Sequence, residues 1–67
     1  MKPVSLISSA IQQVQYHKVG ETLDVLFHDG EMRAYTGVPW RVYQELIRSE
    51  SPGGYFNAKI RDFYKFS

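Results

Sequence analysis

Apolar and polar residues alternate along the first half of the chain, a pattern that is typical of antiparallel strands. Asp29-Gly30 separates two such runs, and this dipeptide tolerates the positive φ angles that a two-residue type I′ hairpin turn requires. A hairpin closed there pairs Asp24 with Tyr35 and collects apolar side chains on one face. The pattern therefore predicts strands at about 21–28 and 31–36.

Val19-Gly20 predicts an earlier hairpin turn of the same kind, preceded by a strand at about 9–18. That turn pairs Tyr16 with Leu23, which places Val14 and Tyr16 on the apolar face of the other hairpin. A slip by one residue would send every side chain to the opposite face. The agreement between the two turns predicts a three-stranded antiparallel meander.

The second half of the chain changes to helical spacing. Pro39 suits the first turn of a helix, and the apolar residues that follow predict a helix over about 39–49 that covers the apolar face of the sheet. Ser51-Pro52-Gly53-Gly54 then breaks the chain. Residues 60–66 fit a helix and a strand equally, and we expect a helical turn or two over about 54–61 and then an extended end. The predicted fold class is α+β: a three-stranded antiparallel meander covered on one face by a helix, with a C-terminal short helix and an extended tail.

Composition narrows the class of protein. A chain of 67 residues is near the lower limit for one folded domain, so we expect a single domain over 1–67. An apolar fraction of 43% with 15% aromatics predicts a packed core. The absence of cysteine excludes a disulfide framework and a thiolate zinc site. No apolar run resembles a signal core or a membrane span, so we expect a cytoplasmic protein without a membrane partner.

Charge directs attention to the C-terminal half, although the net charge of +1 does not by itself imply a nucleic-acid partner. In the predicted register, Arg33 and Tyr35 lie on the polar face of the sheet, where they could stack an unpaired base and contact its phosphate. The alternative is that this face is an ordinary solvated surface. The candidate nucleic-acid-binding residues are Arg33, Tyr35, Arg41, Lys59, Arg61 and Lys65.

Other candidate residues point to binding and not to chemistry. Trp40 and Tyr55 are the aromatics least obviously used by the core, and with Asn57 they are candidate interaction anchors, unless the two rings close over the ends of the core. His17 and His28 fall at hairpin ends, and no nucleophile, paired acid and base, or set of metal ligands can be assembled from the sequence. We therefore expect a non-catalytic protein without a metal or another cofactor.

Several short motifs occur in a recognisable order: Tyr35-Thr36-Gly37-Val38-Pro39, then Ser51-x-Gly53-x-Tyr55-Phe56-Asn57, then Ile60-Arg61. In this order they resemble the KTSC domain family, which is named for the C-terminus of some lysyl-tRNA synthetases and also occurs as free-standing small bacterial proteins. The resemblance covers nearly the whole chain. A central Tyr-x-Tyr motif of the family falls on Arg33-Ala34-Tyr35, so Arg33 replaces the first tyrosine.

The resemblance implies RNA binding, because the family is found attached to a tRNA enzyme. Our leading hypothesis is a non-catalytic module that binds tRNA or another structured RNA through the polar sheet face and the basic C-terminal segment. The alternative is a protein-interaction or homodimerisation module that uses exposed aromatics such as Trp40, Tyr55 and Tyr35 as anchors.

Overall fold

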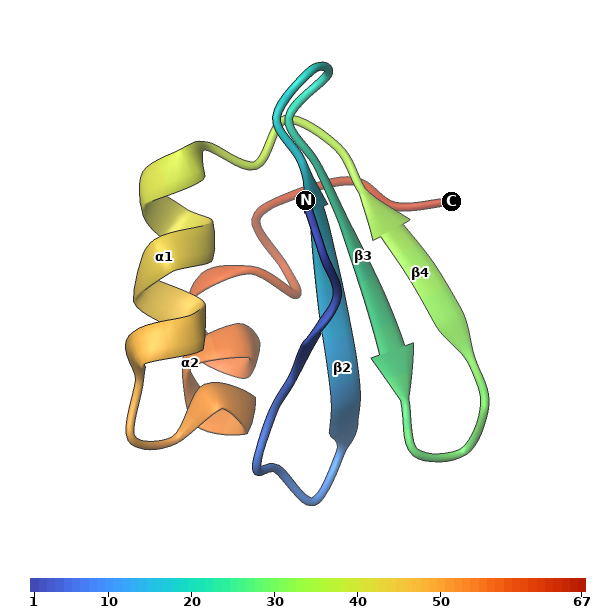
Figure 1. Cartoon of the computed structure of the whole chain (residues 1–67), viewed down its shortest axis with the longest axis vertical. Coiled ribbons are helices and arrows are strands. Elements are labelled where there is room, and N and C mark those ends of the chain that lie inside the picture. Colours follow the sequence, from blue (N-terminus) through green and yellow to red (C-terminus); the bar gives the residue numbers. More distant parts are fainter.

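Helices and sheet form two layers, with both helices on the same face of the sheet (Figure 1). The computed structural model describes all 67 residues. The strands are β1 (Val4–Ser5), β2 (Ile11–His17), β3 (Thr22–Phe27) and β4 (Met32–Tyr35), and the helices are α1 (Trp40–Arg48) and α2 (Pro52–Lys59). The sheet has the order β1-β2-β3-β4, with every neighbouring pair antiparallel. The expected α+β class with a helix over one face is confirmed.

The sheet has four strands, so the expectation of three was wrong. β1 adds to β2 at the outer edge, with Val4 opposite Val14, and the Leu6 amide extends this pairing by donating to the Gln12 carbonyl at 3.2 Å. Because β1 is only two residues long and follows Pro3, it carries no alternation that the sequence pattern could show.

The first predicted hairpin is confirmed in register. Tyr16 lies opposite Leu23 and Val14 opposite Val25, and all four side chains are buried. Gly20 closes the turn at a φ of +89°, where a residue with a side chain would be strained. At the start of β2, the pairing with β3 contains a register shift between residues 11 and 13.

The second hairpin is displaced by one residue from the prediction, because Tyr35 lies opposite Leu23 and not opposite Asp24. The Phe27 amide donates to the Glu31 carbonyl at 2.8 Å, which leaves a loop of three residues (28–30) where two were expected. Gly30 alone in this loop has a positive φ, +93°, so the turn is a three-residue loop ending in a left-handed glycine. The slip reverses the two faces of β4.

The core is dominated by aromatic rings that tie the layers together. Tyr16 stacks on Tyr43 of α1 at a centroid distance of 4.9 Å, and its hydroxyl donates to the Val38 carbonyl at 2.6 Å. Phe56 of α2 packs edge-on against the Tyr35 ring at 5.4 Å. The eleven buried hydrophobic residues form one cluster: Ile11, Val14, Tyr16, Leu23, Val25, Tyr35, Val38, Tyr43, Leu46, Phe56 and Ile60.

Helix α1 begins and ends one residue inside the predicted range, with Pro39 at its N-cap. Helix α2 begins earlier than the predicted 54–61, because Pro52 supplies a φ suited to its first turn. Gly53 faces the N-terminal segment so closely that an added Cβ would lie 2.9 Å from the Ser8 Oγ. Neither helix is long and apolar enough to cross a membrane.

After α2 the chain turns and then becomes extended, which resolves the ambiguity of residues 60–66. The Tyr64 amide donates to the Ile60 carbonyl at 3.3 Å, closing a turn. The last three residues, Lys65–Ser67, which we call the tail, then run along the outer edge of β4. The expected extended end is therefore present, and it covers the edge of the sheet opposite β1.

Candidate nucleic-acid interface

The guanidinium of Arg33 lies between two aromatic rings on the helix-facing side of the sheet. Its Cζ is 5.2 Å from the centroid of Phe27 and 4.5 Å from that of Phe66. Its Nη1 donates to the Tyr35 hydroxyl at 3.2 Å and its Nε to the Glu31 carboxylate at 2.8 Å. These two hydrogen bonds, that of Tyr35 foremost, raise the pKa of the guanidinium above its ordinary value. The charged guanidinium of Arg33 is therefore already in contact with aromatic rings and polar groups of the protein itself.

Tyr35 is completely buried and cannot stack a base. Its ring, 0% exposed, packs against Phe56 at 5.4 Å and Phe66 at 5.2 Å. The prediction that Arg33 and Tyr35 lie on the polar face of the sheet was wrong, and the one-residue slip of β4 is the reason. Tyr35 is excluded as an exposed interaction anchor for the same reason.

The face of the sheet away from the helices remains polar. Gln13, Gln15, His17 and Asp24 alternate onto it as predicted, and the His17 Nε2 is 2.8 Å from the Asp24 Oδ2. A hollow of about 100 Å³ lies on this face beside Met32. The reversed register of β4 brings Met32 and Ala34 to this face in place of Arg33 and Tyr35, so the expected stacking platform is absent from it.

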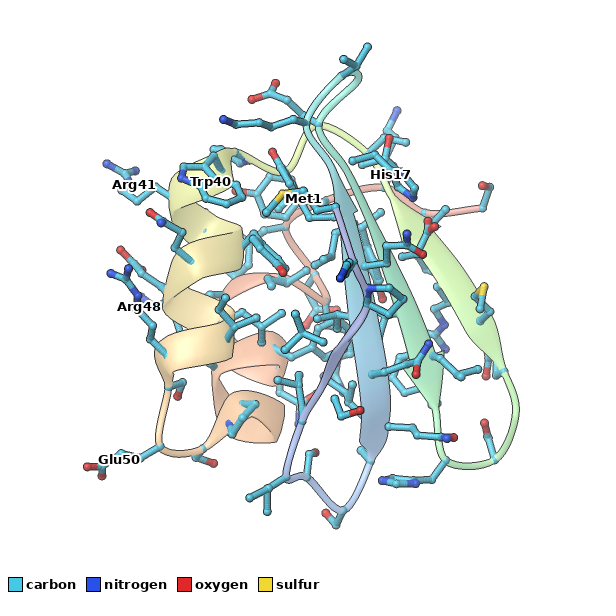
Figure 2. All side chains as sticks on the ribbon, in the orientation of Figure 1. Met1, His17, Trp40, Arg41, Arg48 and Glu50 are labelled. Carbon is cyan, nitrogen blue, oxygen red and sulfur yellow. The ribbon has the colours of Figure 1, made fainter.

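The remaining four predicted cations are all exposed, and each comes from a different part of the chain. Arg41 points away from the sheet on α1 (Figure 2), Lys59 ends α2, and Arg61 lies in the turn that follows. Lys65 belongs to the tail. The Arg61 Nη2 is 3.5 Å from the Asp62 carboxylate, whereas Arg41, Lys59 and Lys65 have no carboxylate within 4.0 Å. Three of the predicted cations are thus free to meet an external anion.

Phe63 is a surface aromatic that sequence analysis did not single out. It lies in the turn between Arg61 and Lys65, and 69% of it is exposed, more than of any other aromatic residue in the chain. We call residues 59–65, with Lys59, Arg61, Phe63 and Lys65 on their surface, the C-terminal basic segment.

The candidate interaction anchors are mostly engaged within the domain. Trp40 is half-buried and packs on Tyr16 at a centroid distance of 5.6 Å. Tyr55 is also half-buried, and its hydroxyl donates to the Glu45 carboxylate at 2.7 Å. Burial and this hydrogen bond raise the pKa of Tyr55 to about 12. Asn57 is exposed on α2. No ring contact joins Trp40 and Tyr55, so these residues do not form one anchor cluster.

Three comparisons with known proteins agree on one family. The KTSC domain model matches residues 7–64. An uncharacterized protein from Stutzerimonas stutzeri (strain A1501) is 37% identical over 57 residues, which cover 85% of this chain and 80% of that protein. The crystal structure of a KTSC domain protein from Yersinia pestis has the same fold, with a TM-score of 0.93 at 24% identity over 98% of this chain and 93% of that one. The chain belongs to the KTSC domain family.

Proposed function

We propose that this domain is a non-catalytic module that binds unpaired RNA through its C-terminal basic segment. The observation that carries the proposal is Phe63, which is 69% exposed between Arg61 and Lys65. Exposure of an apolar ring to water is unfavourable, and the ring adds nothing to the core. A ring flanked by cations matches the base and the phosphate of an unpaired nucleotide. The base stacks on the ring while its phosphates meet the cations.

The Phe63 ring is more accessible to a base than the other aromatic rings considered. Tyr35 is buried, Trp40 and Tyr55 are half-buried, and one face of the Phe66 ring is already in contact with the Arg33 guanidinium. Stacking of one base on an aromatic side chain contributes about 1–3 kcal/mol to binding and tolerates any base. Phe63 therefore gives the proposal a specific and removable contact.

The cations extend the surface on both sides of Phe63. Towards the helices, Arg41 is an exposed cation of α1 that has no carboxylate within 4.0 Å. Towards the sheet, Lys65 pairs with Thr36, and the alternation of the tail places Lys65 on the polar face, opposite to Phe66. A strand of RNA crossing the segment would thus meet Lys65 where the segment reaches the polar face of the sheet.

Titration with a pool of short single-stranded RNAs at about 50 mM salt, followed by fluorescence anisotropy, tests the proposal. Phe63→Ala is expected to weaken binding by about 1–3 kcal/mol, which corresponds to roughly 5- to 150-fold. Lys59→Ala and Lys65→Ala should each reduce the slope of log K against log salt by about 0.7, because each removes one phosphate contact to a single strand.

Arg48→Ala is the matched control, because it removes an exposed, unpaired cation from the last turn of α1. Arg48 lies seven residues beyond Arg41, or about 10 Å along the helix axis. Its removal should leave the affinity nearly unchanged. Equal losses in Arg48→Ala and Lys59→Ala, or no binding at about 50 mM salt, would contradict an RNA site on the C-terminal basic segment.

Salt also separates this proposal from the protein-interaction alternative. At about 0.5 M salt the contacts of exposed charges are screened, whereas association through apolar side chains persists. Binding of a protein partner that survives this salt and is insensitive to Lys59→Ala would favour the alternative.

A further inference from the structure

The outer edge of β4 is a built binding site for a short extended segment. The Ala34 amide and carbonyl both exchange hydrogen bonds with Ser67 at 3.1 Å, and the Thr36 amide donates to the Lys65 carbonyl at 2.9 Å. Between them, Phe66 bridges to Tyr35. Backbone pairing of this kind is how an extended peptide adds to a sheet edge.

A socket for one aromatic side chain accompanies this edge. The Phe66 ring lies 5.2 Å from the Tyr35 ring and 4.5 Å from the Arg33 guanidinium. Arg33 is itself held by the Tyr35 hydroxyl and the Glu31 carboxylate, so the socket is fixed by residues of β4 and its loop. The edge therefore has both parts of a strand-addition site: main-chain pairing and a side-chain socket.

The occupant of this site is held weakly. All three residues of the tail are exposed, and Phe66 keeps 51% of its surface in contact with solvent. Segments with few buried contacts and exposed hydrogen bonds open locally at a small fraction of the global unfolding free energy. Opening of the tail exposes the unpaired amides of Ala34 and Thr36, which is the condition under which a sheet edge recruits another strand.

We propose that the tail of a second copy of this chain occupies the β4 edge, so that two copies exchange tails in a domain-swapped dimer. The second copy is the partner whose fit the structure itself displays, because its Lys65-Phe66-Ser67 makes in trans the contacts that the tail makes in cis. Exchange of an identical element between two copies closes with two-fold symmetry and needs no new interface.

The connection between α2 and the tail can act as the hinge. Ile60 is fully buried and anchors its start. Residues 61–64 are held by turn hydrogen bonds, such as that from the Phe63 amide to the Ile60 carbonyl at 3.1 Å, and by the partial packing of Tyr64 against the core. Four residues, once extended, span up to about 13 Å. Phe63 lies in this hinge.

A mixed sample tests the exchange on the intact chain without RNA. Isotopically labelled and unlabelled protein are combined at about 1 mM, and intermolecular nuclear Overhauser effects are recorded together with sedimentation. Exchange predicts a concentration-dependent dimer with cross-peaks between Phe66 of one copy and Tyr35 of the other. A monomer at this concentration, or a dimer without these cross-peaks, overturns the proposal.

Two variants of similar exposure separate tail exchange from surface association. Phe66→Ala empties the socket in cis and in trans alike, so the weakly held tail is left unbound in both and the dimer should dissociate into monomers with open tails. Met32→Ala truncates another half-exposed side chain of β4, 57% exposed on the opposite face, and should leave dimerisation unchanged. Loss of the dimer in Met32→Ala but not in Phe66→Ala would overturn the proposal, since it would place the contact on the polar face.

A shortened hinge tests the exchange through the dimer dissociation constant. Deletion of Asp62 and Phe63 keeps the tail from reaching its own β4 edge, where it competes at an effective concentration on the order of mM. The dimer dissociation constant should therefore fall at least about tenfold, and an unchanged or larger constant would overturn the proposal. If the shortened chain does not fold, the wild-type cross-peaks decide.

Discussion

The hydrogen bond from Tyr16 to Val38 should be worth more to this domain than any other side-chain hydroxyl in the core. The Tyr16 side chain is 1% exposed, and its hydroxyl lies 2.6 Å from the carbonyl of Val38. Val38 is itself buried in the connection that leads from β4 to α1. The bond therefore joins the middle of the sheet to the start of the helical layer.

Tyr16→Phe removes this bond and keeps the ring. Because the Val38 carbonyl is then left without the donor it has in the wild type, the variant should lose about 1–3 kcal/mol of unfolding free energy. A domain of this size has a total stability of roughly 3–10 kcal/mol. Each kcal/mol lost should lower the melting temperature by about 4–8 °C.

Tyr43→Phe is the matched control, because the Tyr43 ring stacks on Tyr16 at 4.9 Å with an interplanar angle of 16° and is also 1% exposed. No protein group accepts a hydrogen bond from the Tyr43 hydroxyl, and no buried side-chain polar atom lacks a partner, so this hydroxyl reaches solvent. Its removal should change the stability by less than about 0.5 kcal/mol.

Urea unfolding followed by the fluorescence of Trp40, the single tryptophan, measures both variants. The midpoint should fall for Tyr16→Phe with an unchanged m-value, since the surface exposed on unfolding is nearly the same. Equal losses in the two variants, or a loss below about 0.5 kcal/mol in Tyr16→Phe, would refute the reasoning that the buried carbonyl needs its donor.

Two further predictions concern backbone strain and alkaline pH. Gly30→Ala should cost about 1–2 kcal/mol in urea unfolding, because a side chain at φ +93° is strained although no atom lies within 4 Å of it; Gly30→Asn should cost less, and equal costs would contradict this cause. The pKa of Tyr55 is raised to about 12, and those of Tyr16 and Tyr43 are also raised. Since the unfolded tyrosines release their protons near pH 10, stability present below pH 10 should be lost as the pH rises towards 12. Tyr55→Phe should flatten this loss in urea midpoints measured from pH 9 to 12, and a midpoint independent of pH would contradict it.

The elements that the sequence predicted correctly are those in which two local signals agree. In the first hairpin, the turn at Val19-Gly20 and the apolar alternation both require Tyr16 opposite Leu23, and the structure pairs them so. In α1, Pro39 and the helical spacing indicate the same start. Local chemistry was sufficient there because each alternative would have exposed apolar side chains.

The second hairpin shows where local signals stop being sufficient. Asp29-Gly30 fits a two-residue turn and also a three-residue loop in which only the glycine has a positive φ. In the structure, the Asp29 carboxylate accepts a hydrogen bond from the Glu31 amide at 2.9 Å, and the loop has three residues. The longer loop buries the Tyr35 ring against Phe56 of α2, a contact that no pattern within the hairpin reveals.

The candidate site changed for the same physical reason. Lys59, Arg61 and Lys65 were predicted to be accessible because charged residues are rarely buried without partners, and all three are exposed. Tyr35, which was predicted on the polar face, is buried, whereas Phe63, for which no role was predicted, is exposed. Aromatic residues are found in both environments, so their burial depends on what packs against them.

By itself, the sequence determined the α+β class, the first hairpin, helix α1 and the exposure of the C-terminal cations, since each follows from spacing and charge within a short segment. Only the tertiary structure decided the register of β4, the enclosure of Arg33 between Phe27 and Phe66, and the pairing of the tail with β4. These three features depend on contacts between residues far apart in the chain, whose free energies outweigh a local preference of about 1 kcal/mol for one turn or rotamer over another.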